Sequence, residues 1–262
     1  TLYYITPKVW AWKKSRLKQM RDCIDHAALI LPFEEKIYKI AGIPATYVGN
    51  PLMDAYPDHL TKLFMKPGES PEKEIVIGLL PGSRKSEIQK LFSVMLGAAD
   101  RINKNKTHTR FVISKVASIP DSYFNLILNR FNPRFSYEFY TGPVRDLFLK
   151  SDLVIAASGT VTLEAALCCV PTILIYKMSG ISFRIGQILV DLDYVGLANL
   201  IVNKEVMPEL LQDDATPQKI ASKALIMVEN LRYYQEQLSM VRHFLGKKGA
   251  ARRTAAIALQ MM

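Results

Sequence analysis

Cysteine is scarce in this chain of 262 residues, with only Cys23, Cys168 and Cys169 present, the last two adjacent. Such a set cannot build a disulfide framework, and its spacing is not that of metal ligands, so the sequence predicts a reducing compartment and no metal site. The four histidines are scattered along the chain, at positions 26, 59, 108 and 243. Each is expected to be a surface or core residue and not a catalyst, because none stands at motif spacing from a nucleophile.

Long apolar runs are also lacking. No run approaches the roughly 20 residues that a membrane-spanning helix needs, and no leader segment opens the chain, so we expect neither a span nor export. The Gly-x-x-x-x-Gly-Lys-Ser/Thr pattern of many ATPases and the Gly-x-Ser-x-Gly turn of many hydrolases are absent as well. The sequence therefore argues against both of these enzyme classes.

Basic residues outnumber acidic ones by 34 to 24, which gives a formal net charge of +10. A field of this sign attracts anions but does not name them, so nucleic acid, anionic lipid headgroups and phosphorylated metabolites all fit. The early part of the chain concentrates positive charge beside two tryptophans, in Lys8, Trp10, Trp12, Lys13, Lys14, Arg16, Lys18 and Arg21. This segment is interpreted either as a solvated helix face or as a surface for a membrane interface.

Strand and helix patterns alternate through the middle of the chain, which favours an α/β fold with a parallel sheet and right-handed crossovers. We expect strands over 75–80, 110–114, 135–140, 153–157 and 172–176, with helices over 85–103, 120–130, 143–150 and 160–168. Before them, short strands are expected at 2–5, 26–31 and 46–48, with helices at 10–22 and 34–41. A long helix from Pro217 through Phe244 and a final helix after Gly249 complete the prediction.

The composition of residues 55–73, rich in Pro, Asp, Lys and Gly, marks a domain boundary. We therefore expect a remnant of a first domain over 1–54, a nucleotide-binding domain over 55–205 and carboxy-terminal helices over 206–262. The chain opens on Thr1 and directly on a strand, so we also expect it to be a piece of a longer protein.

Two of the expected strands run into turns of small residues that open a helix. The first turn is Pro81-Gly82-Ser83-Arg84, and the second is Ser158-Gly159-Thr160, followed by Glu164. Backbone N–H groups and the positive end of a helix dipole at such turns bind anions in open parallel sheets. Arg84 would add a cation, and Glu164, four residues past Thr160, could accept hydrogen bonds from sugar hydroxyls.

Together these residues predict a nucleotide-sugar site. The competing interpretation is structural, with an ordinary strand-to-helix connection at the first turn and Thr160 capping its helix below an exposed Glu164 at the second.

Several longer stretches carry a resemblance to a known family over nearly the whole chain. They are Ile5–Trp12, Leu31–Glu34, Val48–Asp54, Leu79–Arg84 with Glu87 and Ile88, Ala157–Thr160 with Leu163 and Glu164, Tyr176–Met178, and Asp193–Ile201. In these stretches the chain resembles the lipid-A-disaccharide synthases, which are glycosyltransferases of the GT-B architecture. The resemblance implies a Rossmann-like nucleotide-binding domain, a remnant of the acceptor domain before it, and carboxy-terminal helices.

The resemblance further implies that diacylglucosamine is transferred from UDP-diacylglucosamine to diacylglucosamine 1-phosphate, giving lipid A disaccharide 1-phosphate and UDP. No metal or other cofactor is expected. The residues that would bind the nucleotide sugar are Gly82, Ser83, Arg84, Ser158, Gly159, Thr160, Glu164 and Asn199. Two positions depart from the family's usual pattern, since Ala198 replaces a proline before Asn199 and Asn50 replaces a histidine before Pro51.

The catalytic base is not identified, because the family carries it in residues that precede this part. We therefore expect the piece to bind UDP better than it turns over. The expected location is cytoplasmic, on an anionic surface at the inner face of the bacterial inner membrane, with a homodimer possible and no nucleic-acid partner. The alternatives are a UDP-sugar epimerase of the same architecture and a basic nucleic-acid-binding module.

Overall fold

The computed structural model describes residues 1–9, 15–60, 74–177 and 193–262. These residues divide into two units, each described by itself. The smaller unit contains residues 1–57 and 240–262, and the larger unit contains residues 58–177 and 194–239. The smaller unit is thus assembled from two segments that are far apart in the sequence.

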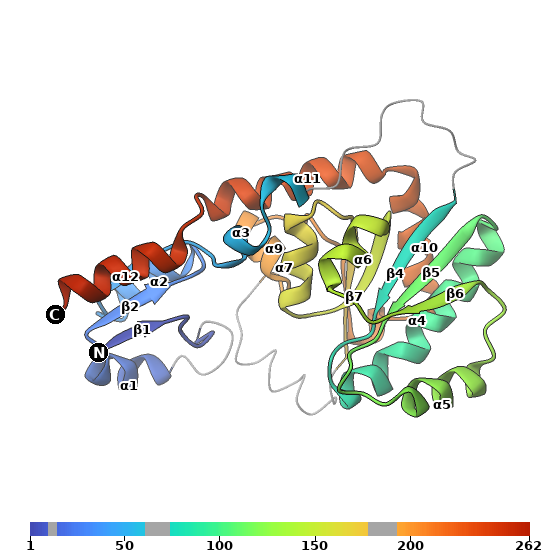
Figure 1. The fold of residues 1–262 in the computed structure, drawn as a ribbon, viewed down its shortest axis with the longest axis horizontal. Coiled ribbons are helices and arrows are strands. Elements are labelled where there is room, and N and C mark those ends of the chain that lie inside the picture. Colours follow the sequence, from blue (N-terminus) through green and yellow to red (C-terminus); the bar gives the residue numbers. More distant parts are fainter. Residues whose placement is uncertain (10–14, 61–73, 178–192) are drawn as a thin grey trace. The chain divides into compact units, whose positions relative to one another are not determined.

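A six-stranded parallel sheet forms the centre of the larger unit (Figure 1). Its strands are β4 (Ile75–Leu80), β5 (Thr109–Ser114), β6 (Tyr137–Tyr140), β7 (Leu153–Ala157), β8 (Thr172–Tyr176) and β9 (Glu209–Leu211). They lie in the order β6-β5-β4-β7-β8-β9, and every pair is parallel. Counted within this unit, that is the 3-2-1-4-5-6 order of doubly wound nucleotide-binding domains. The predicted α/β class with a parallel sheet is confirmed.

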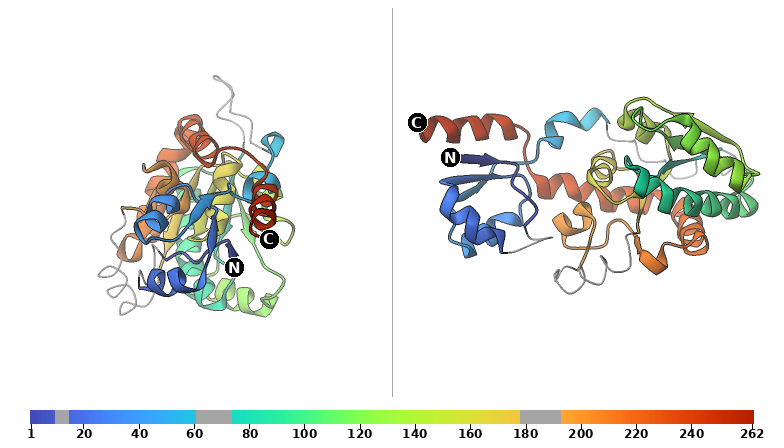
Figure 2. Two further views of the ribbon diagram at one scale, coloured as in Figure 1. Left: turned by 90° about the vertical axis from the view of Figure 1, so that its left-hand side faces the viewer. Right: turned by 90° about the horizontal axis from the view of Figure 1, so that it is seen from below.

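Helices cover both faces of this sheet, as the views in Figures 1 and 2 show. On one face, Ile77 and Leu79 of β4 belong to a buried core with residues of α4 (Lys85–Asn105), α5 (Asp121–Phe131) and α10 (Pro217–Glu229). On the other face, α6 (Val144–Lys150) lies close to β4. A Cβ on Gly78 would come within 2.8 Å of Leu147 Cδ2, so this glycine permits the close approach of α6 to the strand. The α7 helix (Thr160–Leu167) and α9 helix (Leu197–Val202) follow β7 and β8 in the chain.

The carboxy-terminal part differs from the expected single long helix. The prediction of one helix from Pro217 through Phe244 is wrong, because α10 ends at Glu229 and α11 (Leu231–Leu245) begins after Asn230. The Asn230 side chain donates a hydrogen bond from Nδ2 to the Ile226 carbonyl at 2.8 Å, which closes the last turn of α10. Because α10 packs on α4, residues 206–239 belong to the larger unit.

The smaller unit is built on a three-stranded parallel sheet in the order β1 (Leu2–Tyr4), β2 (His26–Leu29), β3 (Ala45–Tyr47). Its core gathers around the fully buried Tyr38 of α2 (Glu34–Ile40), and the other helices are α1 (Arg16–Cys23), α3 (Leu52–Ala55) and, in the other segment, α12 (Ala250–Gln260). Two short 3-10 turns complete the described structure, Asp58–Leu60 and Gln212–Asp214.

The basic early segment is only partly described. Arg16, Lys18 and Arg21 are exposed on α1, and Lys8, which precedes this helix, is exposed as well. Partial burial of its amino group lowers the pKa of Lys8 below its usual range, and the negative charge of Glu34 offsets part of that shift. Four members of the segment lie outside the described residues, namely Trp10, Trp12, Lys13 and Lys14.

Arg253 of α12 contacts both the residues just before this helix and the first segment of the smaller unit. The Arg253 guanidinium donates from Nε to the Val48 carbonyl at 2.7 Å, from Nη1 to the Lys248 carbonyl at 2.8 Å and from Nη2 to the Lys247 carbonyl at 2.8 Å. A Cβ on Gly49 would lie only 2.5 Å from Arg253 Nη2, so a glycine at position 49 leaves room for the guanidinium.

Replacement of Arg253 by alanine is expected to lower the free energy of opening α12 by about 2 kcal/mol, since several hydrogen bonds from a charged donor are lost. Amide hydrogen exchange in α12 measures this opening. The exposed neighbour Arg252 provides the control, because Arg252→Ala removes the same charge and should change the opening energy by less than about 0.5 kcal/mol. Equal exchange in the two variants would show that Arg253 does not hold the helix.

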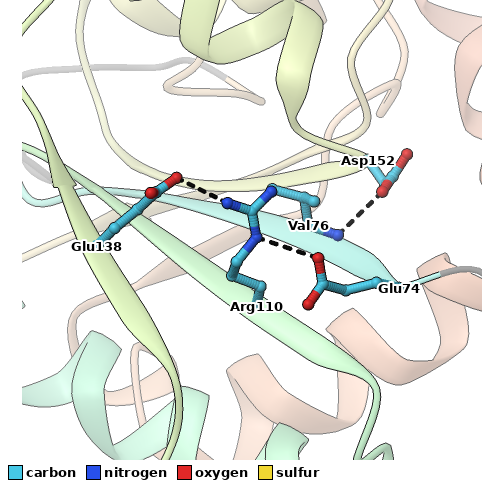
Figure 3. A network of polar contacts seen from close by, with 5 residues as sticks. All are labelled: Glu74, Val76, Arg110, Glu138 and Asp152. Atoms are coloured by element: carbon cyan, nitrogen blue, oxygen red, sulfur yellow. Dashed lines mark hydrogen bonds and ion pairs between the residues drawn. The ribbon is translucent and has the colours of Figure 1, made fainter.

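A network of charged residues crosses the amino-terminal part of the larger sheet (Figure 3). Arg110 of β5 pairs through Nε with Glu74 at 3.1 Å and through Nη1 with Glu138 at 2.9 Å. The buried Asp152, just before β7, accepts a hydrogen bond from the Val76 N–H at 2.9 Å. These contacts join neighbouring strands near their amino ends, away from the edge at which the strand-to-helix turns lie.

Candidate functional site

The two predicted turns meet at one place in the larger sheet. Strands β4 and β7 are neighbours, with Leu80 paired to Ala156, so the chain leaves both strands at the same carboxyl edge. Neighbouring strands lie about 4.8 Å apart. This pair is also the point at which the strand order reverses, where open α/β sheets bind ligands. Residues separated by more than seventy positions in the sequence are thereby brought together.

The first turn is closed by a carboxylate of its own helix. Gly82 has a φ of +111°, in the region that favours glycine, and a Cβ there would lie 2.5 Å from Glu87 Oε2. That oxygen accepts hydrogen bonds from the Ser83 N–H at 3.0 Å and the Arg84 N–H at 3.3 Å. The expectation that these two N–H groups face a ligand therefore needs correction, because Glu87 takes them.

Arg84 remains available for an anion. Its Nη1 donates to Glu87 Oε1 at 2.9 Å, but 77% of the Arg84 side chain is exposed, against 26% for Glu87. A guanidinium carries five N–H donors, so one bond to Glu87 leaves most of them for another partner. At the first turn, the cation is thus better placed to contact a ligand than the backbone is.

The second turn is more open. The Ser158 N–H donates to the Ile175 carbonyl at 2.9 Å and so continues the β7–β8 pairing. Gly159 is the N-cap residue of α7, with extended backbone, and a Cβ there would meet no atom within 4 Å. No side chain caps this end of α7, so the structure does not support the alternative in which Thr160 is the cap.

The hydroxyl of Thr162 turns back into its own helix, donating to the Gly159 carbonyl at 2.8 Å. Thr160 itself is exposed. Because the first N–H groups of a helix have no partner within it, the exposed start of α7 offers donors and a positive dipole end to an anion. Glu164 is half-buried one turn further along the same helix.

Asn199 has a different place from the one expected. It is fully buried, and its Nδ2 donates to the Met207 carbonyl and to Glu209 Oε1, both at 2.7 Å. Its Oδ1 accepts from the N–H groups of Val206 at 2.8 Å and Met207 at 2.9 Å. All four of its hydrogen-bonding positions are taken. Asn199 therefore shapes the loop after α9, and the expectation that it contacts the donor stays a prediction.

Two carboxylates that organise these loops were not foreseen as such. Glu209 accepts from the N–H groups of Val195 at 2.8 Å and Gly196 at 2.9 Å, besides Asn199, and so fixes the start of α9. Nothing in the sequence pairs it with that segment. Glu87, by contrast, stands three residues after Arg84, which is the spacing of a capping box and could have indicated its contacts.

Within the described ranges, no cluster of three or more His, Cys, Asp or Glu side chains could hold a metal ion. Across the same ranges, no helix has both the length and the apolar character to cross a membrane. Cys23 is exposed, whereas Cys168 and Cys169 are buried, and none of the three forms a disulfide bond.

Comparison with known proteins connects this geometry to a family. Residues 1–261 match the family model described as lipid-A-disaccharide synthetase. A lipid-A-disaccharide synthase of Syntrophus aciditrophicus (strain SB) is 36% identical over 268 residues, which cover 99% of this chain and 69% of the relative. The sequence match thus extends over the whole chain and over both turns.

Solved structures share the fold at low identity. The co-structure of S. aureus MnaA with UDP has a TM-score of 0.63 at 14% identity, covering 98% of this chain and 65% of that one. The UDP-GlcNAc 2-epimerase from Neisseria meningitidis, bound to UDP-GlcNAc, has a TM-score of 0.62 at 12% identity, covering 98% and 67%. Such likeness shows the GT-B type of fold and does not favour the epimerase alternative, since the sequence relatives are synthases. From the match over its whole length, the chain belongs to the lipid-A-disaccharide synthetase family and is a glycosyltransferase of lipid A biosynthesis.

Proposed function

We propose that the larger unit binds UDP-diacylglucosamine, and that the sugar is transferred to diacylglucosamine 1-phosphate to give lipid A disaccharide 1-phosphate and UDP. The observation that carries the donor site is the meeting of the two turns at the carboxyl edge of β4 and β7. The UDP and UDP-GlcNAc bound to two structures of similar fold support the class of ligand.

In this proposal the diphosphate lies between the Arg84 guanidinium and the start of α7. Gly159 lets the phosphate approach the backbone, and Thr160 and the N–H groups of the first turn of α7 donate to it. Glu164 accepts from the ribose hydroxyls. As the bond between the sugar and the diphosphate breaks, negative charge develops on the diphosphate, and these groups stabilise that charge.

The base that activates the acceptor is proposed to come from residues of the family outside this chain, which spans 69% of the length of the Syntrophus relative. A base must reach the acceptor hydroxyl within hydrogen-bond distance. We therefore propose that this chain binds UDP more effectively than it transfers sugar.

Titration with UDP in a calorimeter tests the donor site, with a polynucleotide of equal phosphate concentration as the control. We expect saturable, micromolar-range UDP binding, and polynucleotide binding that is weak and falls steeply with salt. Tight polynucleotide binding by a folded chain that does not bind UDP would favour the nucleic-acid alternative instead.

Gly159 gives a sharper test of where the phosphate lies. Gly159→Ala should leave the melting temperature unchanged, because its backbone is extended and a Cβ there meets no protein atom within 4 Å. The methyl group would instead occupy the space proposed for the phosphate, and UDP affinity should fall by about tenfold, measured by calorimetry. Unchanged affinity would place the phosphate elsewhere.

For the location, we propose attachment of the protein to the cytoplasmic face of the bacterial inner membrane through positive charge. The exposed Arg16, Lys18 and Arg21 on α1 support this, since each basic residue near an anionic surface adds attraction.

A further inference from the structure

Among the residues that the structure describes, Glu87 is the only charged side chain that contacts both the backbone N–H groups of the first turn and the guanidinium of Arg84. One carboxylate oxygen takes the N–H groups of Ser83 and Arg84, and the other pairs with Arg84 Nη1 at 2.9 Å. Two consecutive N–H groups and a guanidinium are the groups with which proteins hold phosphate. An anion that belongs to the protein thus fills the part of the donor site in which a ligand anion would bind.

The fit of this carboxylate depends on the adjoining glycine. Glu87 Oε2 lies 2.5 Å and Glu87 Cβ lies 2.7 Å from the position of a Cβ on Gly82, so the side chain folds directly over that residue. In a phosphate-binding turn a glycine lets the phosphate approach the backbone closely. Here Gly82 makes that room for the Glu87 side chain instead.

Resting on the proposed donor site, we infer that Glu87 is an internal anion that competes with the UDP diphosphate for Arg84 and the first turn, and so weakens UDP binding and speeds UDP release. A second anion beside the carboxylate is repelled, and it finds two N–H groups and one guanidinium donor already engaged. The diphosphate of UDP is then bound mainly by the remaining donors of Arg84 and by the N–H groups at the start of α7. A glycosyltransferase gains from this arrangement, because the product UDP carries more charge at the diphosphate than the donor sugar does and is the species that must leave.

Glu87→Gln tests the inference with little change in shape. The glutamine oxygen can still accept hydrogen bonds from the N–H groups of the turn, while the negative charge is removed. We expect UDP to bind about two- to fivefold more tightly and to dissociate more slowly in stopped-flow measurements, the size typical of one partly exposed charge. Affinity for uridine, which lacks the diphosphate, should not change. Glu87→Ala should show the same direction where it folds, as judged by its melting temperature.

The matched control is Glu138→Gln. Glu138 also pairs with an arginine Nη1 at 2.9 Å, that of Arg110, but on the network away from the turns (Figure 3). Its loss should leave UDP affinity unchanged, which separates a local effect from a change in net charge. Weaker or equal UDP binding by Glu87→Gln would overturn the inference and assign Glu87 to positioning Arg84. Absence of UDP binding by the unaltered chain would instead remove the proposed donor site.

Discussion

Asn199→Ala is expected to destabilise the larger unit by about 3 kcal/mol or more. The side chain is fully buried, and its removal leaves the N–H groups of Val206 and Met207 and the Met207 carbonyl without this partner. Glu209 would also lose the amide that lies 2.7 Å from its carboxylate. Buried polar groups that lose their partners cost far more than an exposed bond does. Urea unfolding, followed by circular dichroism, measures the loss.

Two further variants sharpen this result. Asn199→Asp keeps the shape but places a second carboxylate beside Glu209, so at neutral pH it should cost at least as much as alanine. Asn125 is exposed on α5, and Asn125→Ala should change the free energy of unfolding by less than about 0.5 kcal/mol. If Asn199→Ala kept full stability while losing UDP binding, the original prediction of a donor-site contact would stand and our structural assignment would fall.

Glu164→Ala is expected to weaken UDP binding by about tenfold or more, equivalent to roughly 1.4 kcal/mol, which is the net value of one or two hydrogen bonds. Glu164→Gln keeps one acceptor oxygen and should lose less. Calorimetry gives both affinities, and comparison with UMP and with a deoxyribose analogue would locate the loss at the sugar and not at the diphosphate.

The control for charge is Glu229, which is exposed at the end of α10 in the same unit. Glu229→Ala should bind UDP as the unaltered chain does. Should Glu164→Ala fold normally and keep its UDP affinity, the carboxylate would have no part in holding the ribose.

Most of the larger sheet could be predicted from the sequence, because parallel strands covered on both faces are nearly continuous in apolar residues. Strands β4, β7 and β8 have the expected bounds. Strand β9 was missed, since its three residues Glu209–Leu211 are too short for a periodic pattern and begin with a carboxylate. The break at Asn230 was missed because the apolar periodicity continues on both sides of it, although the Asn230 side chain closes the last turn of α10.

In the candidate site, too, the sequence predicts local features but not the contacts that form only on folding. The turns themselves are local features, so their residues could be read from the sequence and their meeting follows from the strand order. Which groups are already engaged could not be read, because it depends on partners supplied by folding. Glu209 lies ten positions from Asn199 in another element, and its contact with that residue only exists once β9 has joined the sheet.

The smaller unit takes residues from both ends of the described chain, and this has a consequence for synthesis on the ribosome. Its strands β1 to β3 are translated before the larger unit, but Gly249, Leu245 and Arg253, the hydrogen-bond partners of Asp54, Tyr47 and Val48, are translated after it. Since translation adds about 5 to 20 residues per second, that early sheet remains incomplete for many seconds while the larger unit is made. These strands therefore complete their hydrogen bonds only after the larger unit has been translated.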